Sequence, residues 1–390
     1  MQIEWDKGGK AVKITMPKPA DMHQHLRRGA LLHLVAPMVA RRFSKAIVMP
    51  NTVPPITTYE MVRQYLLEIK LATNSEYRSG KPDFWPLMTM YLTDTLEPHE
   101  LRAGLDQKLV FGVKYYPRGL TTNSDSGIAD PASLWSKGTK PYAVLRELAD
   151  YNAVLLLHAA DGFATDLWNN EGRFYGPGEE LDPWDQEPHF ICNTLPRIRE
   201  AHPDLKISVE HLSTAIGADW LRTHGGDTLG CSLTAQHLLL DRRDVFRQGF
   251  RPHRFWWPII QSSEHKEELC KLVAEGHPFV WLGSDSAPHP VGKKETDCCS
   301  GGVLMAHAGI ELFLEAFEDI GCLHKLEDFA CVNGPRFYDL KPSDLYITLV
   351  REEWSVAEAF YAEDMSEESG GLDKVVPFRL GESIRWKLVD

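Results

Sequence analysis

The segment that decides the fold reads Ile14-Thr15-Met16-Pro17-Lys18-Pro19-Ala20-Asp21-Met22 and continues as His23-Gln24-His25. Its first part has extended character and predicts a β-strand near 14–22. Alternate side chains of a strand point to the same face, so His23 and His25 aim two imidazoles at one point. Imidazole nitrogen is a common ligand of zinc and similar ions. The segment therefore predicts half of a metal site at the end of a strand.

Four later apolar runs also end in a polar residue of a kind found in metal centres. These residues are Lys114 after 109–113, His158 after 154–157, His211 after 207–210 and Asp285 after 279–284. Together with the His-x-His pair they extend from position 23 to position 285. So many polar strand ends over such a length of chain indicate a ring of strands whose ends face a common centre.

The order of elements predicts an α/β fold. Eight strand-like runs lie near 14–22, 45–49, 86–92, 109–115, 153–158, 206–211, 228–234 and 279–284. Helical patterns lie between them, over Tyr59–Ala72, Tyr142–Tyr151 and Ser262–Glu275. Strands that alternate with helices imply parallel pairing with helical crossovers. Eight such units predict a (β/α)8 TIM barrel, whose active site lies at the carboxyl ends of the strands.

Two regions fall outside this repeat. Asp161–Pro203 reads as a long loop over the predicted catalytic face, and serves as a lid, a partner surface or a tolerated insertion. The tail predicts a mixed helix near Leu345–Ala359, an extended run over 375–380 and packing against the barrel. We therefore expect one barrel domain over 1–390, with an inserted loop near 161–203 and a C-terminal extension near 341–390.

Composition restricts the class of function. The chain has 390 residues, 43% hydrophobic and 25% charged, with a net charge of −13. These values are typical of soluble globular proteins and disfavour nonspecific binding to nucleic acid or anionic membranes. Met1–Lys13 lacks the apolar core of a signal peptide, and no apolar run approaches the length of a membrane span. The seven cysteines show no C-x-x-C spacing and fit a reducing, cytoplasmic location.

The candidate ligands exceed the needs of one ion. His23, His25, His158, His211 and Asp285 offer four imidazoles and one carboxylate. One ion usually takes three or four protein ligands, so the set suggests two ions that share a bridge. The ammonium of Lys114 is untenable beside cations, and burial favours the neutral amine. A neutral lysine can take up carbon dioxide and become a carbamate, which would supply an anionic bridge.

Five motifs carry a resemblance to a known family. They are His23-Gln24-His25-Leu26-Arg27; Val48-Met49-Pro50-Asn51 with Pro54-Pro55-Ile56-Thr57-Thr58; Lys114-Tyr115-Tyr116-Pro117; Val209-Glu210-His211; and Gly283-Ser284-Asp285-Ser286-Ala287-Pro288-His289. Together they resemble dihydroorotase of the amidohydrolase superfamily, in its short single-domain type. The resemblance extends from about residue 14 to 340, and less clearly to Val350-Arg351-Glu352-Glu353.

The resemblance implies a metal-dependent amidohydrolase barrel with a binuclear zinc site. One Zn²⁺ ion would be held by His23, His25 and Asp285, and the other by His158 and His211. Carboxylated Lys114 and a hydroxide would bridge the two ions, and Asp285 would act as general base and acid. The implied reaction interconverts N-carbamoyl-L-aspartate and dihydroorotate in pyrimidine biosynthesis.

Substrate contacts are also expected. Arg27 follows the His-x-His pair and suits bidentate pairing with a carboxylate, and the resemblance adds Asn51 and His289. The resemblance further implies backbone contacts to the ring amides, and a mobile loop whose hydroxyls close over the substrate. The backbone contacts would come from Leu238 and Gly301, and the loop hydroxyls from Thr121 and Thr122. Similar proteins are usually dimers, so a homodimer is possible.

The chain departs from the family pattern at two places. Arg28 stands where an acid is usual, and Ala159-Ala160 stands where Gly and Glu are usual. These changes keep open a related cyclic amidohydrolase that acts on another carboxylate-bearing ureide or imide. A catalytically inactive homologue that serves as an assembly partner is disfavoured, because all six candidate metal positions are present.

Each motif residue has a plainer explanation when it is taken alone. A histidine at a strand end is more often a structural residue, and Arg27 could pair with a neighbouring acid. The matching order of the whole set favours ligation. Five other histidines lack such a context and are expected to be exposed or structural: His237, His253, His265, His277 and His307. Cys298 and Cys299 are expected to be free thiols in a loop.

Overall fold

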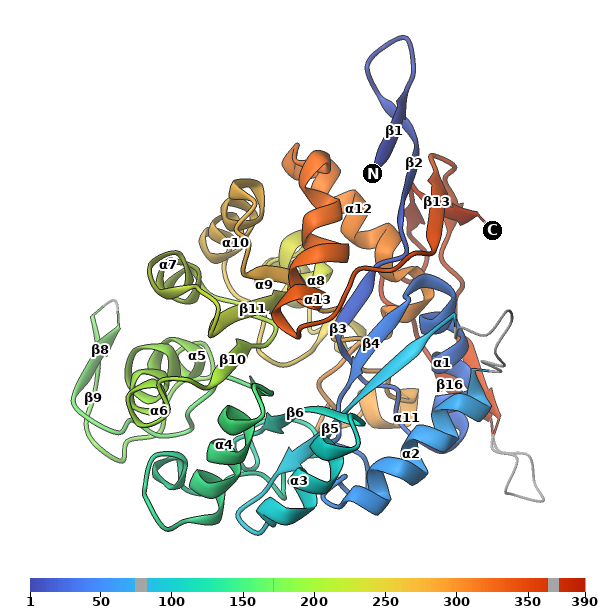
Figure 1. Ribbon diagram of the computed structural model, residues 1–390. Helices are drawn as coiled ribbons and strands as arrows, with labels where there is room; N and C mark the ends of the chain where they lie inside the picture. The colour runs from blue at the N-terminus through green and yellow to red at the C-terminus, as the bar shows by residue number, and fades with distance from the viewer. Residues whose placement is uncertain (74–82, 171, 364–371, 390) are drawn as a thin grey trace.

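A barrel of eight parallel strands forms the centre of the protein in a computed structural model that describes residues 1–73, 83–170, 172–363 and 372–389 (Figure 1). In ring order the strands are β3 Ala20–Gln24, β4 Lys45–Val48, β5 Trp85–Leu92, β6 Val110–Tyr115, β7 Val154–Leu157, β10 Lys206–Val209, β11 Leu229–Leu233 and β12 Val280–Leu282. The prediction of a (β/α)8 TIM barrel is confirmed.

The ring closes where the last strand meets the first. The backbone N–H of Asp285 donates to the carbonyl of His23 at 2.9 Å, and the N–H of His25 donates to the carbonyl of Ser286 at 3.2 Å. Both bonds lie at the carboxyl ends of β12 and β3. Closure of the barrel therefore places the His-x-His pair directly beside Asp285.

The interior of the barrel is filled by side chains below this mouth. In β7, Val154 and Leu156 belong to an inner cluster, whereas Leu155 and Leu157 belong to the core between strands and helices. This alternation is the two-residue period of a strand that is buried on both faces. Trp281 is fully buried in the inner cluster, with its ring 4.7 Å from that of Phe337. The filled interior leaves the polar strand ends at the opposite mouth.

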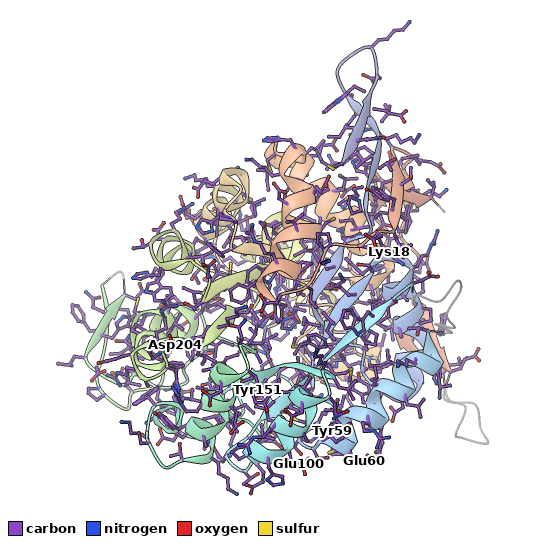
Figure 2. The ribbon with its side chains drawn as sticks, viewed as in Figure 1. Lys18, Tyr59, Glu60, Glu100, Tyr151 and Asp204 are labelled. Atoms are coloured by element: carbon purple, nitrogen blue, oxygen red, sulfur yellow. The ribbon has the colours of Figure 1, made fainter. Side chains whose placement is uncertain are left out.

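Helices surround the barrel, and the three predicted helices are confirmed within two residues of their expected bounds. The main ones are α1 Gly29–Arg42, α2 Tyr59–Ala72, α3 Pro98–Asp106, α4 Lys140–Asp150, α6 Leu195–Ala201, α7 Ala215–His224, α10 Ser263–Glu275 and α12 Gly309–Ile320. Contacts at the start of α2 explain why this boundary could be predicted from the sequence. Thr58 accepts a hydrogen bond from the N–H of Met61 at 3.2 Å, and Glu100 of α3 accepts from the N–H of Tyr59 at 2.8 Å (Figure 2).

The predicted strand over 14–22 is wrong as a single element. Ala11–Pro17 forms β2, which pairs antiparallel with β1 Gln2–Trp5 and β13 Tyr346–Val350 in a side sheet. The chain enters the barrel as β3 only after Pro17-Lys18-Pro19. The two prolines cannot donate ladder hydrogen bonds, and the amine of Lys18 (labelled in Figure 2) donates to the carbonyls of Ala40 at 2.6 Å and Asp83 at 3.2 Å.

The predicted helix near Leu345–Ala359 is also wrong. This part of the tail forms β13, which pairs with β2 and with β18 Lys387–Val389, followed by β14 Trp354–Ser355. Ile347 and Leu349 alternate with more exposed neighbours, so the period is that of a strand. Of the extended run expected over 375–380, only Val375 lies in a strand, at the end of β16 Leu372–Val375.

The region over 161–203 is not a loop throughout. Its first half contains a hairpin of β8 Trp168–Asn170 and β9 Arg173–Tyr175, which lies at the edge of the molecule (Figure 1). Its second half is helical, as α5 Gln186–His189, a π-turn over Phe190–Thr194 and α6. The helical half supplies the crossover between β7 and β10. None of the helices in the described ranges is both long enough and apolar enough to cross a bilayer.

Candidate metal centre and substrate pocket

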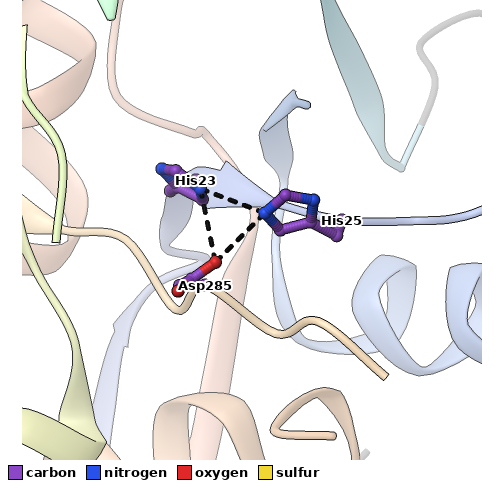
Figure 3. Close-up of side chains that lie close together, drawn as sticks. All are labelled: His23, His25 and Asp285. Carbon is purple, nitrogen blue, oxygen red and sulfur yellow. Dashed lines mark hydrogen bonds and ion pairs between the residues drawn. The ribbon is translucent and has the colours of Figure 1, made fainter. Parts of the chain in front are cut away.

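Three predicted ligand atoms converge at the mouth of the barrel (Figure 3). The Nε2 atoms of His23 and His25 lie 3.3 Å apart, and Oδ1 of Asp285 lies 3.3 Å from the first and 3.1 Å from the second. Ligands about 2.0–2.1 Å from a tetrahedral zinc ion are about 3.3–3.4 Å apart. The three side chains are buried and already have the spacing that one such ion requires.

A second pair of nitrogens lies beside this group. Nδ1 of His158 and Nε2 of His211 are 3.1 Å apart, and the ring of His211 lies 5.0 Å from that of His23. The amine of Lys114 is fully buried and has no hydrogen-bond partner among the described residues. Burial lowers the pKa of Lys114 to about 8, against the opposing charges of Glu210 and Asp285. A buried amine without a partner in the described part of the chain fits the carboxylated lysine that the family resemblance implies.

The charge states favour metal binding. Burial lowers the pKa of His25 to about 4 and holds the pKa values of His158 and His211 well below their usual range. These imidazoles are therefore neutral near pH 7, which is the form that binds a metal ion. Burial alone would raise the pKa of Asp285, but its contacts with the imidazoles of His23 and His25 hold it well below the ordinary value. Burial opposes ionisation of His23, but Asp285 and Glu210 raise its pKa above the ordinary value, so the site combines three neutral imidazoles and one more basic imidazole with an anionic oxygen.

Glu210 completes the centre and was not predicted as a site residue. Its carboxylate accepts a hydrogen bond from Nδ1 of His23 at 2.5 Å, and also accepts from the hydroxyls of Ser208 and Ser232. With Nδ1 engaged in this way, Nε2 of His23 is left to face Asp285 and His25. The place of Glu210, directly before His211 in the quoted motif, was the one signal in the sequence that could have identified it.

Asn51 has an unexpected partner. Its side-chain oxygen accepts from Nδ1 of His25 at 2.8 Å, and its amide donates to the carbonyl of Thr122 at 3.3 Å. The residue that the resemblance assigns to the substrate therefore also fixes the orientation of a ligand imidazole. It also joins that imidazole to the loop over Thr121–Thr122.

Strained backbone conformations gather at the site. Arg27, His211 and Asp285 have φ angles of 61°, 43° and 47°, in the left-handed region. A residue with a side chain costs about 1–3 kcal/mol there. All three lie just past the end of a barrel strand, where the sharp turn brings the next residues back across the mouth. Such cost persists only where the surrounding structure fixes the conformation, as it does in functional sites.

The pocket above the ligand atoms is narrow. It has a free volume of about 20 Å³ and is lined by His23, His25, Arg27, Asn51, Tyr116, Thr121, Thr122, His158, His211, Trp257, Asp285, Ala287, Gly301 and Gly302. The hydroxyl of Thr122 donates to the carbonyl of Gly301 at 3.1 Å and accepts from its N–H at 3.0 Å. The Thr121–Thr122 loop thus engages the backbone groups of Gly301 that are expected to bind a substrate ring.

Arg27 is held at one side of this pocket. Its guanidinium donates to Nε2 of His289 at 3.0 Å and to the carbonyl of Pro288 at 3.2 Å. Burial and the charge of Arg27 hold the pKa of His289 well below its usual range, so this imidazole is neutral and can accept. The next residue, Arg28, pairs with Glu68 and lies 5.7 Å above the ring of Tyr65. The departure from the family pattern at Arg28 therefore concerns an ion pair outside the pocket lining.

Some predicted contacts are not brought together. Leu238 lies in the short helix α8 Ala235–Leu239, is not among the lining residues of the described pocket, and its carbonyl accepts a weak bond from the thiol of Cys270 at 3.6 Å. His237 is buried and accepts from the indole N–H of Trp256 at 2.9 Å, as expected of a structural histidine. Conversely, Tyr116 and Trp257 line the pocket and were not singled out from the sequence.

The fold is a (β/α)8 barrel of the metal-dependent amidohydrolase type. Imidazoles, a carboxylate and a buried lysine cluster at the carboxyl ends of its strands, as this class of protein requires. No protein-family model matches the chain. It is 37% identical over 382 residues to a dihydroorotase of Nitrosomonas europaea, covering 97% of this chain and 99% of that protein. A dihydroorotase of Azoarcus sp. is 39% identical over 376 residues, covering 96% and 99%.

Solved structures agree with these relatives. The crystal structure of dihydroorotase from Saccharomyces cerevisiae in complex with 5-fluoroorotic acid has a TM-score of 0.82, with 27% identity over 97% of this chain and 98% of that one. The chain belongs to the dihydroorotase family and is a hydrolase that acts on cyclic amide bonds. The family membership that the motifs suggested is confirmed.

Proposed function

We propose that this protein interconverts N-carbamoyl-L-aspartate and dihydroorotate in pyrimidine biosynthesis, with two Zn²⁺ ions bridged by N6-carboxylated Lys114. The observation that carries the proposal is the convergence of His23, His25 and Asp285 within 3.3 Å of one another, together with the buried amine of Lys114, which has no partner among the residues that the structure describes. We propose further that the protein works in the cytoplasm, as a homodimer.

The ligand sets divide between the two ions. His23, His25 and Asp285 would hold the first ion, and His158 and His211 the second, with the carbamate of Lys114 between them. Ions bound there would lower the pKa of a water molecule and polarise the carbonyl under attack. Three neutral histidines, His25, His158 and His211, and an ionised Asp285 support this assignment, because each of these groups is already in the state that binds a metal ion.

Asp285 is the proposed general base and acid. In ring opening its carboxylate takes the proton of the attacking water and delivers it to the ring nitrogen that leaves. Its depressed pKa leaves the carboxylate ionised and so able to accept a proton, and the transferred proton then makes it the acid. The reverse order of the same two transfers closes the ring. Burial of the site excludes bulk water from this exchange.

The remaining residues would bind the substrate. Arg27, with His289 and Asn51, would hold the carboxylate, while the backbones of Gly301 and Leu238 would contact the ring amides. The lining of the pocket by Arg27, Asn51 and Gly301 supports three of these roles, whereas the position of Leu238 lends its role no support. The hydroxyls of Thr121 and Thr122 would close over the bound ring. The yeast relative binds 5-fluoroorotic acid, a ring with a carboxylate, and supports a ligand of this class.

The test combines metal analysis with turnover. The purified protein is expected to contain two zinc equivalents and to hydrolyse dihydroorotate in preference to hydantoin and dihydrouracil. Hydantoin and dihydrouracil lack the carboxylate that Arg27 is proposed to hold. Faster hydrolysis of either compound than of dihydroorotate would therefore contradict the role assigned to Arg27. A protein that is rich in metal and inert toward dihydroorotate would favour a cyclic amidohydrolase with another carboxylate-bearing ureide or imide substrate.

A further inference from the structure

Tyr116 has a polar group that the mechanism above does not use. It follows β6, its side chain is 2% exposed, and it lines the pocket together with Arg27 and His158. Its phenol oxygen has no hydrogen-bond partner among the described residues. A buried hydroxyl without a partner is costly, and native structures seldom keep one without a reason. The pocket position gives this hydroxyl a possible partner in the bound substrate.

The surroundings of the ring place Tyr116 at the metal end of the pocket. The ring lies 5.0 Å from the amine of Lys114 and 6.2 Å from the ring of His158, two of the candidate metal-centre residues. On its other side lies Tyr91, with ring centroids 5.0 Å apart. The hydroxyl of Tyr91 donates to the carbonyl of Asn123 at 3.3 Å, so this neighbour is satisfied and Tyr116 is not.

The carboxylate end of the pocket has its own set of residues, namely Arg27 with His289 and Asn51. At the metal end, His158 and His211 direct ring nitrogens toward each other at 3.1 Å, so these nitrogens serve as ligands rather than as donors to a substrate. Of the hydroxyl groups in the described lining, that of Tyr116 directly follows a barrel strand, whereas Thr121 and Thr122 belong to the loop and the hydroxyl of Thr122 is engaged with Gly301.

We propose that the phenol of Tyr116 donates a hydrogen bond to the substrate oxygen on which negative charge develops as the cyclic amide carbon is attacked. This inference rests on the proposed function, since it assigns a role within the same reaction. The phenol keeps its proton throughout and transfers no group. Its hydrogen bond strengthens as the carbonyl oxygen gains charge, so it stabilises the transition state more than the bound substrate.

Tyr116→Phe removes the hydroxyl and keeps the ring contacts with Tyr91 and His158. We expect kcat for dihydroorotate to fall about 100- to 1000-fold, the range for loss of one donor to a developing oxyanion, with KM changed less than about threefold. The zinc content and the melting temperature should stay at the wild-type values. These two measurements separate a lost substrate contact from damage to the metal centre or to the fold.

Tyr115→Phe is the matched control. Tyr115 is also fully buried, and its phenol also lacks a partner among the described residues. Its ring packs against Phe190 at 5.8 Å, and it does not belong to the lining of the described pocket. Successive side chains at the end of a strand point to opposite faces, which explains the difference. We expect its kcat to remain within about twofold of wild type, because a merely structural hydroxyl has no part in the transition state.

Three results would overturn the inference: an unchanged kcat in Tyr116→Phe, a loss confined to KM, or an equal loss of kcat in Tyr115→Phe. If the wild-type protein does not turn over dihydroorotate, the proposed function fails separately. The same pair of variants is then compared on the cyclic amide that the wild type hydrolyses fastest, and the same three results decide the role of Tyr116.

Discussion

Glu210→Gln should weaken zinc binding without unfolding the protein. The carboxylate of Glu210 lies 2.5 Å from Nδ1 of His23, and both side chains are at most 1% exposed. The glutamine amide has nearly the same shape, so it can keep the contacts with the hydroxyls of Ser208 and Ser232. It loses the negative charge that polarises His23 and makes its Nε2 a stronger ligand.

The magnitude follows from the role of such partners. Mutation of the hydrogen-bond partner of a ligating histidine costs about 10- to 100-fold in metal affinity, or about 1.4–2.7 kcal/mol. The contact between Glu210 and His23 is short and excluded from water, so we expect the upper half of this range. Zinc affinity would be measured by competition with a chromophoric chelator, and zinc content by elemental analysis after dialysis.

A buried carboxylate far from the metal ligands supplies the control. Glu311 is 1% exposed and forms a bidentate pair with Arg42, behind the barrel strands. Glu311→Gln should lower the free energy of unfolding, because it leaves a buried guanidinium without its charge partner, and should leave zinc affinity unchanged. An unchanged zinc affinity in Glu210→Gln, or an equal loss in Glu311→Gln, would refute the reasoning.

Three other predictions follow from the site. Lys114→Ala should reduce the zinc content from two equivalents to at most one and lower kcat at least about 100-fold, since it removes the proposed bridge; retention of both ions by elemental analysis would contradict it. Thr122→Val should raise KM for dihydroorotate several-fold, because it breaks both contacts between the loop and Gly301. Michaelis–Menten kinetics would test this, with Thr73→Val, a substitution outside the pocket, as the control variant. Burial lowers the pKa of Lys294 to about 8, so between pH 8 and the usual lysine value near 10.5 the unfolded chain binds more protons. The free energy of unfolding should therefore rise with pH in that window, and denaturant titrations should show a smaller rise in Lys294→Met.

The barrel could be predicted because its strands are buried on both faces. Such strands read as short apolar runs, and in a barrel of this type polar residues follow at the catalytic mouth. The predictions near 14–22 and 345–359 were wrong because the strands with which these segments pair could not be identified from the sequence. Pro17-Lys18-Pro19 keeps an extended conformation while the chain moves from the side sheet to the barrel. Likewise, Tyr346–Val350 is fixed as a strand by β2 and β18, which lie far away in the sequence.

The candidate site divides in the same way. His23, His158 and His211 could be proposed as ligands because His23 lies near the end of a strand and the other two follow apolar strands, so position in the chain alone marks them. Glu210 could not be assigned, because its role depends on contact across the mouth of the barrel. It lies at the end of β10, whereas His23 belongs to β3, and the two strands are not neighbours in the ring. The two residues are 187 positions apart in the sequence, and other strands lie between theirs in the ring, so the diameter of the barrel determines the distance between their side chains.

The diameter also explains why the site depends on the whole ring. Barrel closure sets Asp285 beside His23 through a backbone hydrogen bond of 2.9 Å, while the width of the mouth sets Glu210 against the far side of the same imidazole. One ring nitrogen thus faces a residue from the last strand and the other a residue from the middle of the ring. A change of strand number or tilt would alter both distances at once. The metal centre is therefore a property of the closed barrel, and a substitution that loosens the closure should disturb zinc binding before it disturbs any single ligand.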